Sequence, residues 1–361
     1  MKGGRMMDNS TMIANLSEPN LETSGPPSIL YYIMGFWALG TGTTGFLANI
    51  LVILVFCITP KLRTPFNYLL MNLSACELVI SVTGNWLLAA NSFSRRWLLS
   101  ARACQVNAFG MTYLGILSIV TLTVLAIQRY MMITQDRQFP LSTNLSTCMT
   151  LVLIWVYTLA IALPPFLGFG EFGLNTLKVS CGVVWDFNIN ADHYKVEYMV
   201  YIYLLGFLIP LMIIFYCYTK IMKAVKSSGM NGLLENDAKR RAKRRRDRKI
   251  TNMVAIMLAA YLITWFPYAI VSISEAAGYK PYSSLTFAIY ALPTMLAKVC
   301  VCLDPLIYFG FNPQFQDEVR KYWNKQVINL EVSFQGSKET PRAPSTLVSP
   351  ATEFIEATSV V

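Results

Sequence analysis

The sequence predicts an all-α membrane protein with seven transmembrane helices and a short amphipathic eighth helix. Three observations support this fold class. The 361-residue chain is 54% hydrophobic and only 14% charged, whereas a soluble domain of this length carries more charge. Its mean hydropathy is +0.44, which indicates that much of the chain faces lipid. Seven stretches are also long enough to cross a bilayer, since a spanning helix needs about 20 mostly apolar residues.

The seven apolar stretches follow one another with mostly short connections. No connection is long enough for a soluble domain, and we find no internal repeat of transporter type. We therefore expect an extracellular arm (residues 1–28), one seven-helix domain (29–311), an amphipathic helix (312–326) and a disordered cytoplasmic tail (327–361). The predicted spans are residues 30–58, 66–92, 104–133, 147–169, 198–222, 250–273 and 284–311.

Basic residues set the predicted orientation. Twelve of the thirty Lys and Arg residues lie between Lys220 and Lys249, around the end of the fifth span and in the connection after it. Such clustering is typical of a cytoplasmic loop and disfavours nucleic-acid binding, although the net charge is +10. The N-terminus is then extracellular, where the sequons at Asn9 and Asn15 can be glycosylated. No apolar run precedes Ile29, so we expect no cleaved signal peptide.

The cysteines and the single histidine limit the possible chemistry. The sequence has no CxxC motif and no Cys/His cluster, and His193 is the only histidine. We therefore expect no zinc site, no Ser-His-Asp triad, no catalytic Cys-His pair and no enzyme. The predicted topology places Cys104 and Cys181 on the oxidising extracellular side, where we expect a disulfide between the second outer loop and the third span.

Apart from Lys220 at the end of the fifth span, the charged residues inside the predicted spans are Glu77, Arg129, Lys298 and Asp304. Such groups are costly in a bilayer and usually functional. Lys298 lies too far from either end of its span for its amine to reach water easily. Burial favours the neutral amine, which is the nucleophile that forms a Schiff base with an aldehyde. A structural ion pair with a carboxylate is the alternative, and residue chemistry alone does not separate the two.

The chain from Asn49 to Phe315 resembles the rhodopsin-like receptors. The resemblance rests on motifs that occur in order, one or more per helix, rather than on any single motif. They are Asn49, Asn72 to Glu77, Gln128-Arg129-Tyr130, Trp155, Pro210 with Tyr218, Trp265-Phe266-Pro267-Tyr268 and Asp304-Pro305-Leu306-Ile307-Tyr308.

Within these receptors the sequence resembles animal opsins, because Lys298 lies six residues before Asp304 and Tyr268 follows the tryptophan motif. Residues 121–126 also resemble encephalopsin-like and other non-visual opsins. The resemblance implies 11-cis-retinal on Lys298, packed beside Trp265 and Tyr268, in a multi-pass protein of the plasma membrane or a photoreceptor membrane. Light would then drive helix 6 outward about Pro267 and activate a heterotrimeric G protein.

The same resemblance assigns a signalling switch to a set of residues at the inner ends of the helices. Arg129 would restrain the dark state, with Asp247 as its ion-pair partner. Alternatively, Asp247 only offsets part of the surrounding basic run. Gln128 replaces the usual acid before the arginine, so we expect some constitutive signalling. The assigned residues are Gln128, Arg129, Tyr130, Tyr218, Asp247, Asp304, Pro305 and Tyr308.

The sequence departs from the opsin pattern at the counterion of the Schiff base. A protonated Schiff base in an apolar pocket needs a negative charge, yet the two usual carboxylate positions hold Asn107 and Asn175. Another acid could serve, namely Glu171, Glu197 or Glu275. Alternatively, an anion such as chloride binds among the two asparagines and nearby hydroxyls. The third alternative is a neutral base that absorbs in the ultraviolet; we favour the first two.

A second departure concerns Glu77 and Asp304, which face each other in the family fold. The family usually pairs one acid with one amide at these positions. Two close buried carboxylates cannot both ionise cheaply, so one should hold a proton or a cation should bridge them.

The cytoplasmic segments suggest several partners. Nine of the eleven residues from Lys239 to Lys249 are basic, which suits contact with anionic lipid and with a G protein. The tail is rich in Ser and Thr, as expected for a receptor kinase and arrestin. Its end, Ser359-Val360-Val361, fits a PDZ domain.

Three alternatives to a light-sensing receptor remain. They are a same-fold receptor for a diffusible ligand, a retinal photoisomerase and, less favoured, a transporter or channel.

Overall fold

The computed structural model describes residues 26–134, 144–185, 193–231, 238–279, 283–312, 314–322 and 324. The chain divides into Met1–Gln316, which holds the helical bundle, and Asp317–Val361. The predicted glycosylation sites at Asn9 and Asn15, the kinase and arrestin region and the PDZ ligand lie outside the described residues.

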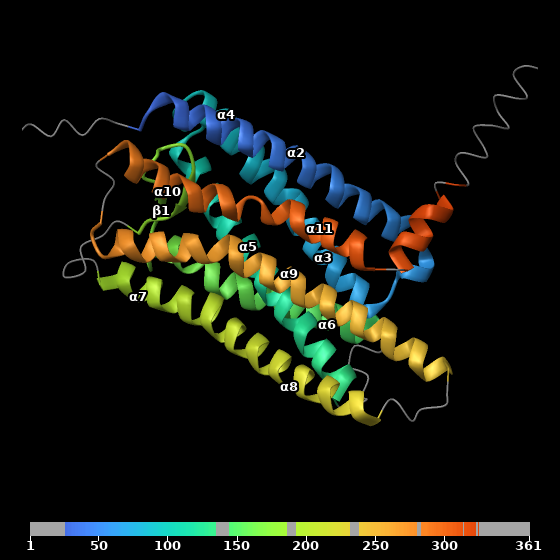
Figure 1. Ribbon diagram of the computed structural model, residues 1–361. Coiled ribbons are helices and arrows are strands. Elements are labelled where there is room, and N and C mark those ends of the chain that lie inside the picture. The colour runs from blue at the N-terminus through green and yellow to red at the C-terminus, as the bar shows by residue number, and fades with distance from the viewer. Residues whose placement is uncertain are drawn as a thin grey trace, which may run out of the picture. The chain divides into compact units, whose positions relative to one another are not determined.

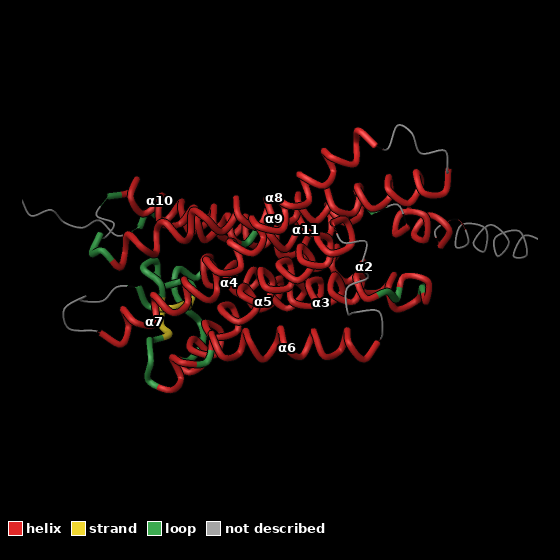
Figure 2. The backbone as a smooth tube through the Cα atoms, turned by 90° about the horizontal axis from the view of Figure 1, so that it is seen from below, coloured by secondary structure: helices red, strands yellow, loops and turns green. Residues whose placement is uncertain are grey.

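Seven helical spans of the described residues are long and apolar enough to cross a membrane, which confirms the predicted fold class. Figure 1 shows them running lengthwise beside one another, and Figure 2 shows α6 along one side of the bundle. The spans are formed by α2 (Ser28–Ile58); α3 (Pro65–Ile80) with the π-helical η2 (Ser81–Trp86) and α4 (Leu87–Phe93); α5 (Ala101–Thr134); α6 (Asn144–Ala162); α7 (His193–Tyr203) with the π-helical η4 (Leu204–Leu208) and α8 (Ile209–Asn231); α9 (Ala238–Ala276); and α10 (Ser284–Ala297) with α11 (Cys300–Phe311).

The third span, α5, is the most enclosed of the seven. In an apolar stretch of 18 residues in α5, 61% are buried, against 22–50% in the corresponding stretches of the other spans. The outer faces of the other helices carry exposed large apolar side chains such as Phe215, Phe266 and Leu292. Such an apolar exterior is what lipid, rather than water, favours. The interior around α5 is therefore where a buried site must lie.

Buried amides join the spans to one another. Asn49 Nδ2 of α2 donates to the carbonyl of Val301 in α11, at 2.9 Å. Asn72 of α3 donates to Thr121 Oγ1 of α5, and its Oδ1 accepts from Trp155 Nε1 of α6 at 2.8 Å. Hydrogen bonds in an apolar surrounding have no water to compete with them, so these contacts fix α2 relative to α11, and α3, α5 and α6 relative to one another.

The fourth span ends earlier than the sequence predicted. The apolar run continues to residue 169, but α6 stops at Ala162 and a 3₁₀ turn, η3, covers Pro164–Leu167. Pro164 and Pro165 explain the difference, because a proline in a helix interior lacks the backbone N–H and clashes with the preceding turn.

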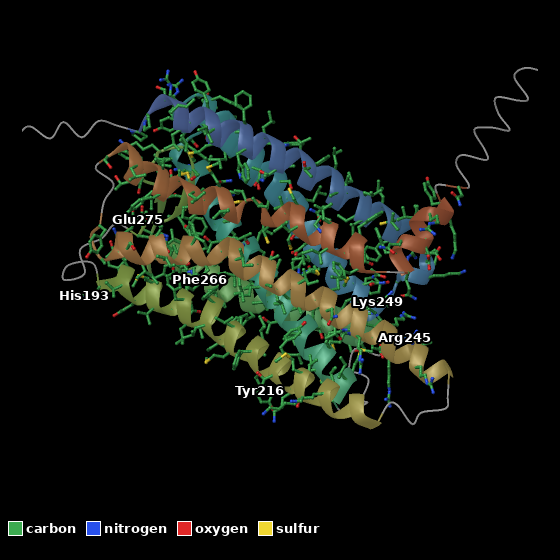
Figure 3. All side chains as sticks on the ribbon, in the orientation of Figure 1. His193, Tyr216, Arg245, Lys249, Phe266 and Glu275 are labelled. Carbon is green, nitrogen blue, oxygen red and sulfur yellow. A yellow bond between two sulfur atoms is a disulfide. The ribbon has the colours of Figure 1, made fainter. Side chains whose placement is uncertain are left out.

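The predicted loop between residues 223 and 249 is largely helical. α8 continues to Asn231 and α9 already begins at Ala238. Lys and Arg are good helix formers, so a basic segment can prolong a helix beyond the apolar part that hydropathy detects. Figure 3 shows Arg245 and Lys249 on this prolonged part of α9, at the opposite end of the bundle from Glu275 and His193.

A short hairpin lies at the end of the bundle that holds Glu275. Strands β1 (Phe172–Leu174) and β2 (Cys181–Val183) pair antiparallel, with Leu174 opposite Cys181. Cys181 forms a disulfide with Cys104 of α5, as predicted. The hairpin is thereby fixed to the end of the third span.

The segment after α11 is also helical, over residues 314–322. Lys321 Nζ donates to Glu318 Oε1 at 2.7 Å, and this hydrogen bond raises the pKa of the exposed Lys321 amine. The sequence predicted an amphipathic helix over residues 312–326, which includes this segment.

Candidate functional site

A cavity of about 250 Å³ lies within the end of the bundle that the hairpin covers. Its walls come from the second, third, fifth, sixth and seventh spans and from the hairpin. Most of the wall is apolar or aromatic, and the side chains that decide its chemistry are Met111, Tyr203, Trp265, Tyr268, Glu275 and Lys298. A largely apolar cavity with a few polar groups is typical of a small-molecule site.

Lys298 lies where the seventh span is interrupted. α10 ends at Ala297 and α11 begins at Cys300, and the carbonyl of Lys298 accepts from Asn85 Nδ2 at 3.2 Å. The amine Nζ contacts Met111 Sδ at 3.5 Å, and no carboxylate of a described residue lies within ion-pair distance of it. The structural ion pair that the sequence left open is thus not formed, and the amine faces the cavity.

Gly84 provides the space for this amine. A Cβ at position 84 would lie 2.7 Å from Lys298 Nζ and 2.8 Å from Met111 Sδ, well inside van der Waals contact. Gly84 belongs to the π-helical η2, whose extra residue changes which side chains of the second span face inward. The sequence did not single out Gly84, because a π-helical turn has no reliable sequence signal.

Aromatic rings form the inner end of the cavity. Trp265 stacks on Tyr261 with 5.6 Å between ring centroids, and Tyr268 meets Trp265 edge-on at 6.0 Å. A Cβ at Gly115 would lie 2.9 Å from Trp265 Cη2, so the third span approaches this ring closely only because residue 115 is glycine. Trp265 and Tyr268 thus both lie on the cavity wall, and their contact with retinal stays a prediction.

The hairpin segment closes the outer side of the cavity. Trp185, two residues after β2, donates from Nε1 to Tyr268 Oη at 3.3 Å. Tyr203 and Ser272 also hydrogen-bond through their hydroxyls, which joins the fifth and sixth spans beside the cavity. Trp185 was missed from the sequence, since a single aromatic residue in a long loop carries no positional signal.

The counterion candidates separate into two groups. Asn107, Asn175 and Glu275 line the cavity. Asn107 Nδ2 donates to the Thr83 carbonyl at 2.8 Å, and Glu275 accepts from Thr176 Oγ1 at 2.5 Å.

Glu171 and Glu197 are not among the lining residues. The side chain of Glu171 is 51% exposed and pairs with Lys195 at 2.7 Å, and Glu197 is exposed on α7. Glu171, which the sequence placed first among the acids, is therefore engaged outside the cavity.

Glu77, Asp304 and Cys300 meet in the interior. Each offers a ligand atom within 4.8 Å of the others, and no carboxylate oxygen of the two acids has a hydrogen-bond partner among the described residues. A small cavity of about 50 Å³ is lined by Glu77, Cys300 and Lys298, among others. The two acids that the sequence expected to face each other are thus brought together, and Cys300 joins them.

The signalling residues lie towards the other end of the bundle, where α5 ends. Arg129 and Gln128 are buried, and Tyr218 Oη donates to the Thr251 carbonyl at 3.3 Å. Tyr308 packs edge-on against Phe315 at 4.7 Å. The predicted ion pair between Arg129 and Asp247 is not formed: no carboxylate of a described residue lies within ion-pair distance of Arg129. The ring of Phe66 lies on its guanidinium instead.

Comparison with known proteins agrees with this arrangement. A family model described as "7 transmembrane receptor (rhodopsin family)" matches residues 48–308, which is most of the chain. The chain belongs to the rhodopsin family of seven-transmembrane receptors. Receptors of this family are multi-pass membrane proteins, and the seven spans of the structure fit that description.

Individual matches place this receptor among the animal opsins. A melanopsin of Phodopus sungorus is 31% identical over 86% of the chain, and a GQ-coupled rhodopsin of Mizuhopecten yessoensis is 32% identical over 79%. The receptor spans only 66% and 58% of the length of these two proteins. The crystal structure of squid rhodopsin superposes with a TM-score of 0.74 at 25% identity, covering 85% of this chain and 89% of squid rhodopsin. The likeness of residues 121–126 to encephalopsins stays a prediction.

Proposed function

We propose that this receptor senses light through retinal bound to Lys298 and passes the signal to a heterotrimeric G protein. One observation carries the proposal: the amine of Lys298 faces an aromatic cavity, and among the described residues its one polar contact is with the Met111 sulfur. An amine without an ion pair in an apolar surrounding is a nucleophile for an aldehyde. The likeness to melanopsins and rhodopsins supports retinal as that aldehyde.

The residues present fit retinal. The cavity is mostly apolar, its inner end is aromatic, and Gly84 leaves space beside the amine that any larger side chain would fill. Retinal, joined to Lys298 through a Schiff base, supplies light absorption and a change of shape. The chain's own residues must hold it in the 11-cis form, exclude water and transmit the change.

Trp265 and Pro267 are the residues that would transmit the change in the shape of retinal. Trp265 lies on the cavity wall and packs on Tyr261, whose hydroxyl donates to the Gly115 carbonyl of α5 at 3.0 Å. Pro267 stands inside α9, where a proline weakens the helix because it lacks a backbone N–H. A push on the Trp265 ring therefore acts on α9 beside its weakest turn, and the basic end of α9 is where the response emerges.

We place that basic end in the cytoplasm, against a G protein and anionic lipid. The run from Lys239 to Lys249 supports this orientation, since cytoplasmic segments carry the excess of Lys and Arg. The name of the GQ-coupled rhodopsin of Mizuhopecten yessoensis supports a Gq-class partner. The N-terminal arm with Asn9 and Asn15 is then extracellular and open to glycosylation. The tail remains our candidate for receptor kinase, arrestin and PDZ contacts.

For the negative charge opposite Lys298 we retain two candidates. Glu275 is the one carboxylate among the described residues that line the main cavity, although it is held by Thr176 near the hairpin. Chloride beside Asn107 is the other, because the Asn107 amide lies on the cavity wall near the second span. Glu171 supports this role least, since Lys195 already pairs with it.

Light-dependent nucleotide exchange tests the proposal. Purified protein is incubated with 11-cis-retinal, and GTPγS uptake by a Gq-class heterotrimer is followed in darkness and after a flash. We expect a new absorption band and faster uptake after light, both absent from Lys298→Arg and retained in Lys195→Arg. Light-independent stimulation by a diffusible ligand would contradict the proposal. Repeated conversion and release of retinal without nucleotide exchange would also contradict it and would indicate a photoisomerase.

A further inference from the structure

The guanidinium of Arg129 lies on the face of a phenylalanine ring. Its Cζ is 4.1 Å from the centroid of Phe66, which belongs to the first turn of α3. Both side chains are buried, with 3% of Arg129 and 8% of Phe66 exposed. The pair joins the inner ends of the second and third spans.

Arg129 has few other partners. Gln128 Oε1 is 3.5 Å from its Nη2, at the limit of a hydrogen bond, and Nε has no acceptor among the described residues. Neither Asp247 nor any other described carboxylate lies within ion-pair distance. Asp247 acts on the guanidinium only from beyond ion-pair distance. A buried cation with no carboxylate in contact is unfavourable, so its other attractive contacts help to decide where it lies.

The ring of Phe66 is well suited to provide that contact. The face of an aromatic ring carries negative potential, and its attraction for a cation is strongest where water is excluded. The ring is also held firmly by its own helix start. Thr64 caps α3 by accepting from the Asn67 N–H, and Asn67 Nδ2 donates to the Leu62 carbonyl at 2.7 Å. Phe66 thus stands on a fixed first turn and presents a fixed surface to Arg129.

We propose that Phe66 is a positioning residue that holds Arg129 in the resting state, in place of an ion pair. The proposal rests on the proposed signalling function for its activity readout, but not for its structural one. It predicts that the strength of the cation–π contact sets the activity without light. Gln128 alone does not make this receptor constitutively active if the ring replaces the missing acid.

A fluorination series at Phe66 separates the ring's charge distribution from its size. Mono-, di- and trifluorophenylalanine are incorporated at position 66 through a suppressor tRNA, which progressively removes negative potential from the ring face while changing its volume little. We expect dark GTPγS uptake to rise in steps, by about tenfold across the series, since a desolvated cation–π contact is strong enough for such a change. Phe66→Leu should reach the upper limit, and Phe66→Trp should stay near the native level.

Phe287 of α10 provides the matched control. It is as buried as Phe66, with 8% exposed, and among the described residues no cation lies over its ring. The same fluorination at Phe287 should leave dark uptake unchanged. A rise at Phe287 as large as that at Phe66 would assign the effect to packing and overturn the proposal. A tenfold rise of dark uptake in Asp247→Asn, together with unchanged uptake across the Phe66 series, would also overturn the proposal, because that result would indicate an ion pair.

A distance measurement keeps the test independent of the G protein. Spin labels are placed on the exposed Cys148 of α6 and on Lys249→Cys of α9, in a Cys57→Ser background, and the distance between them is measured in darkness. We expect a growing population with α9 displaced as fluorination at Phe66 increases. If native protein shows no light-dependent nucleotide exchange, the signalling proposal fails while this distance series still decides on Phe66. A distance distribution that fluorination does not alter overturns the role of Phe66.

Discussion

Two basic side chains in the bundle interior, the half-buried Lys298 and the buried Arg129, lie in different halves of the bundle and have different surroundings. Neither has a described carboxylate within ion-pair distance. Lys298 opens on a cavity of about 250 Å³, with a sulfur atom and the space left by Gly84 beside it. Arg129 instead packs on the ring of Phe66. The comparison shows that free space beside an amine permits chemistry, whereas close packing of a guanidinium only fixes its position.

The largest effect should come from the surroundings of the Lys298 amine, which Gly84 and Met111 provide. Replacing Gly84 with Val should reduce the yield of retinal-bound pigment at least tenfold, because even a Cβ at this position would lie 2.7 Å from the amine. The ratio of visible to 280 nm absorbance after reconstitution measures the yield. Gly110→Ala is the matched control, since its Cβ would meet nothing within 4 Å. Normal pigment yield from Gly84→Val would show that Lys298 does not use this space.

The next largest effect should come from the covalent link between the hairpin and α5. The disulfide closes a sequence separation of 77 residues, for which a chain-entropy estimate gives about 4.5 kcal/mol of stability. The double variant Cys104→Ala, Cys181→Ala should therefore lower the midpoint of thermal unfolding by many degrees, as followed by fluorescence of a thiol-reactive dye. Cys217→Ala, which removes a buried free thiol, serves as the control. An unchanged midpoint in the double variant would mean that the hairpin is held by packing alone.

The acid pair of Glu77 and Asp304 should give a spectroscopic effect rather than a large change in the free energy of unfolding. Glu77 and Asp304 are each 2% exposed and close together, so we expect one of them to hold a proton. Infrared difference spectra should show a protonated-carboxyl band that Glu77→Gln removes or shifts. Glu275→Gln, at the cavity edge, should leave that band in place. If no protonated-carboxyl band is present in native protein, a bridging cation becomes the better explanation.

The smallest predicted effect concerns the outer side of the cavity. Trp185→Phe keeps the ring but removes the hydrogen bond to the Tyr268 hydroxyl, a loss of about 1 kcal/mol. The release of retinal after light should therefore become about fivefold faster, as measured by the rise of tryptophan fluorescence. Tyr157→Phe, which removes a hydroxyl contact outside the cavity, is the control. Equal release rates in both variants would show that this part of the hairpin does not limit release.

The fold and part of the site could be predicted from the sequence because their signals are periodic or chemical. Hydropathy located seven spans, and a lysine inside an apolar run is unusual enough to mark Lys298. The disulfide followed from topology alone. Helix ends were less predictable: α9 begins at Ala238, twelve residues before its apolar part, since a basic segment can be helical without being hydrophobic.

The residues that the sequence did not identify depend on local geometry that no sequence motif marks. Gly84 matters because of the π-helical turn that contains it, Trp185 because of where a loop folds, and Phe66 because of a contact between two helices. An aromatic residue or a glycine in an apolar helix is common, so type and spacing alone do not distinguish these positions. The structure has no ion pair between Arg129 and Asp247, which agrees with the other alternative, that Asp247 offsets part of the basic run. An acid near a basic run is easily noticed in a sequence, and an aromatic ring is not.

The central claim is that the Lys298 amine is the site of covalent attachment. Pigment formed with 11-cis-retinal is reduced with borohydride in detergent, digested and analysed by mass spectrometry. The account predicts a retinyl group on the peptide that contains Lys298 and on no other peptide, and no retinyl peptide from Lys298→Arg. A retinyl group on another lysine, such as Lys195, or retained covalent uptake by Lys298→Arg, would contradict it.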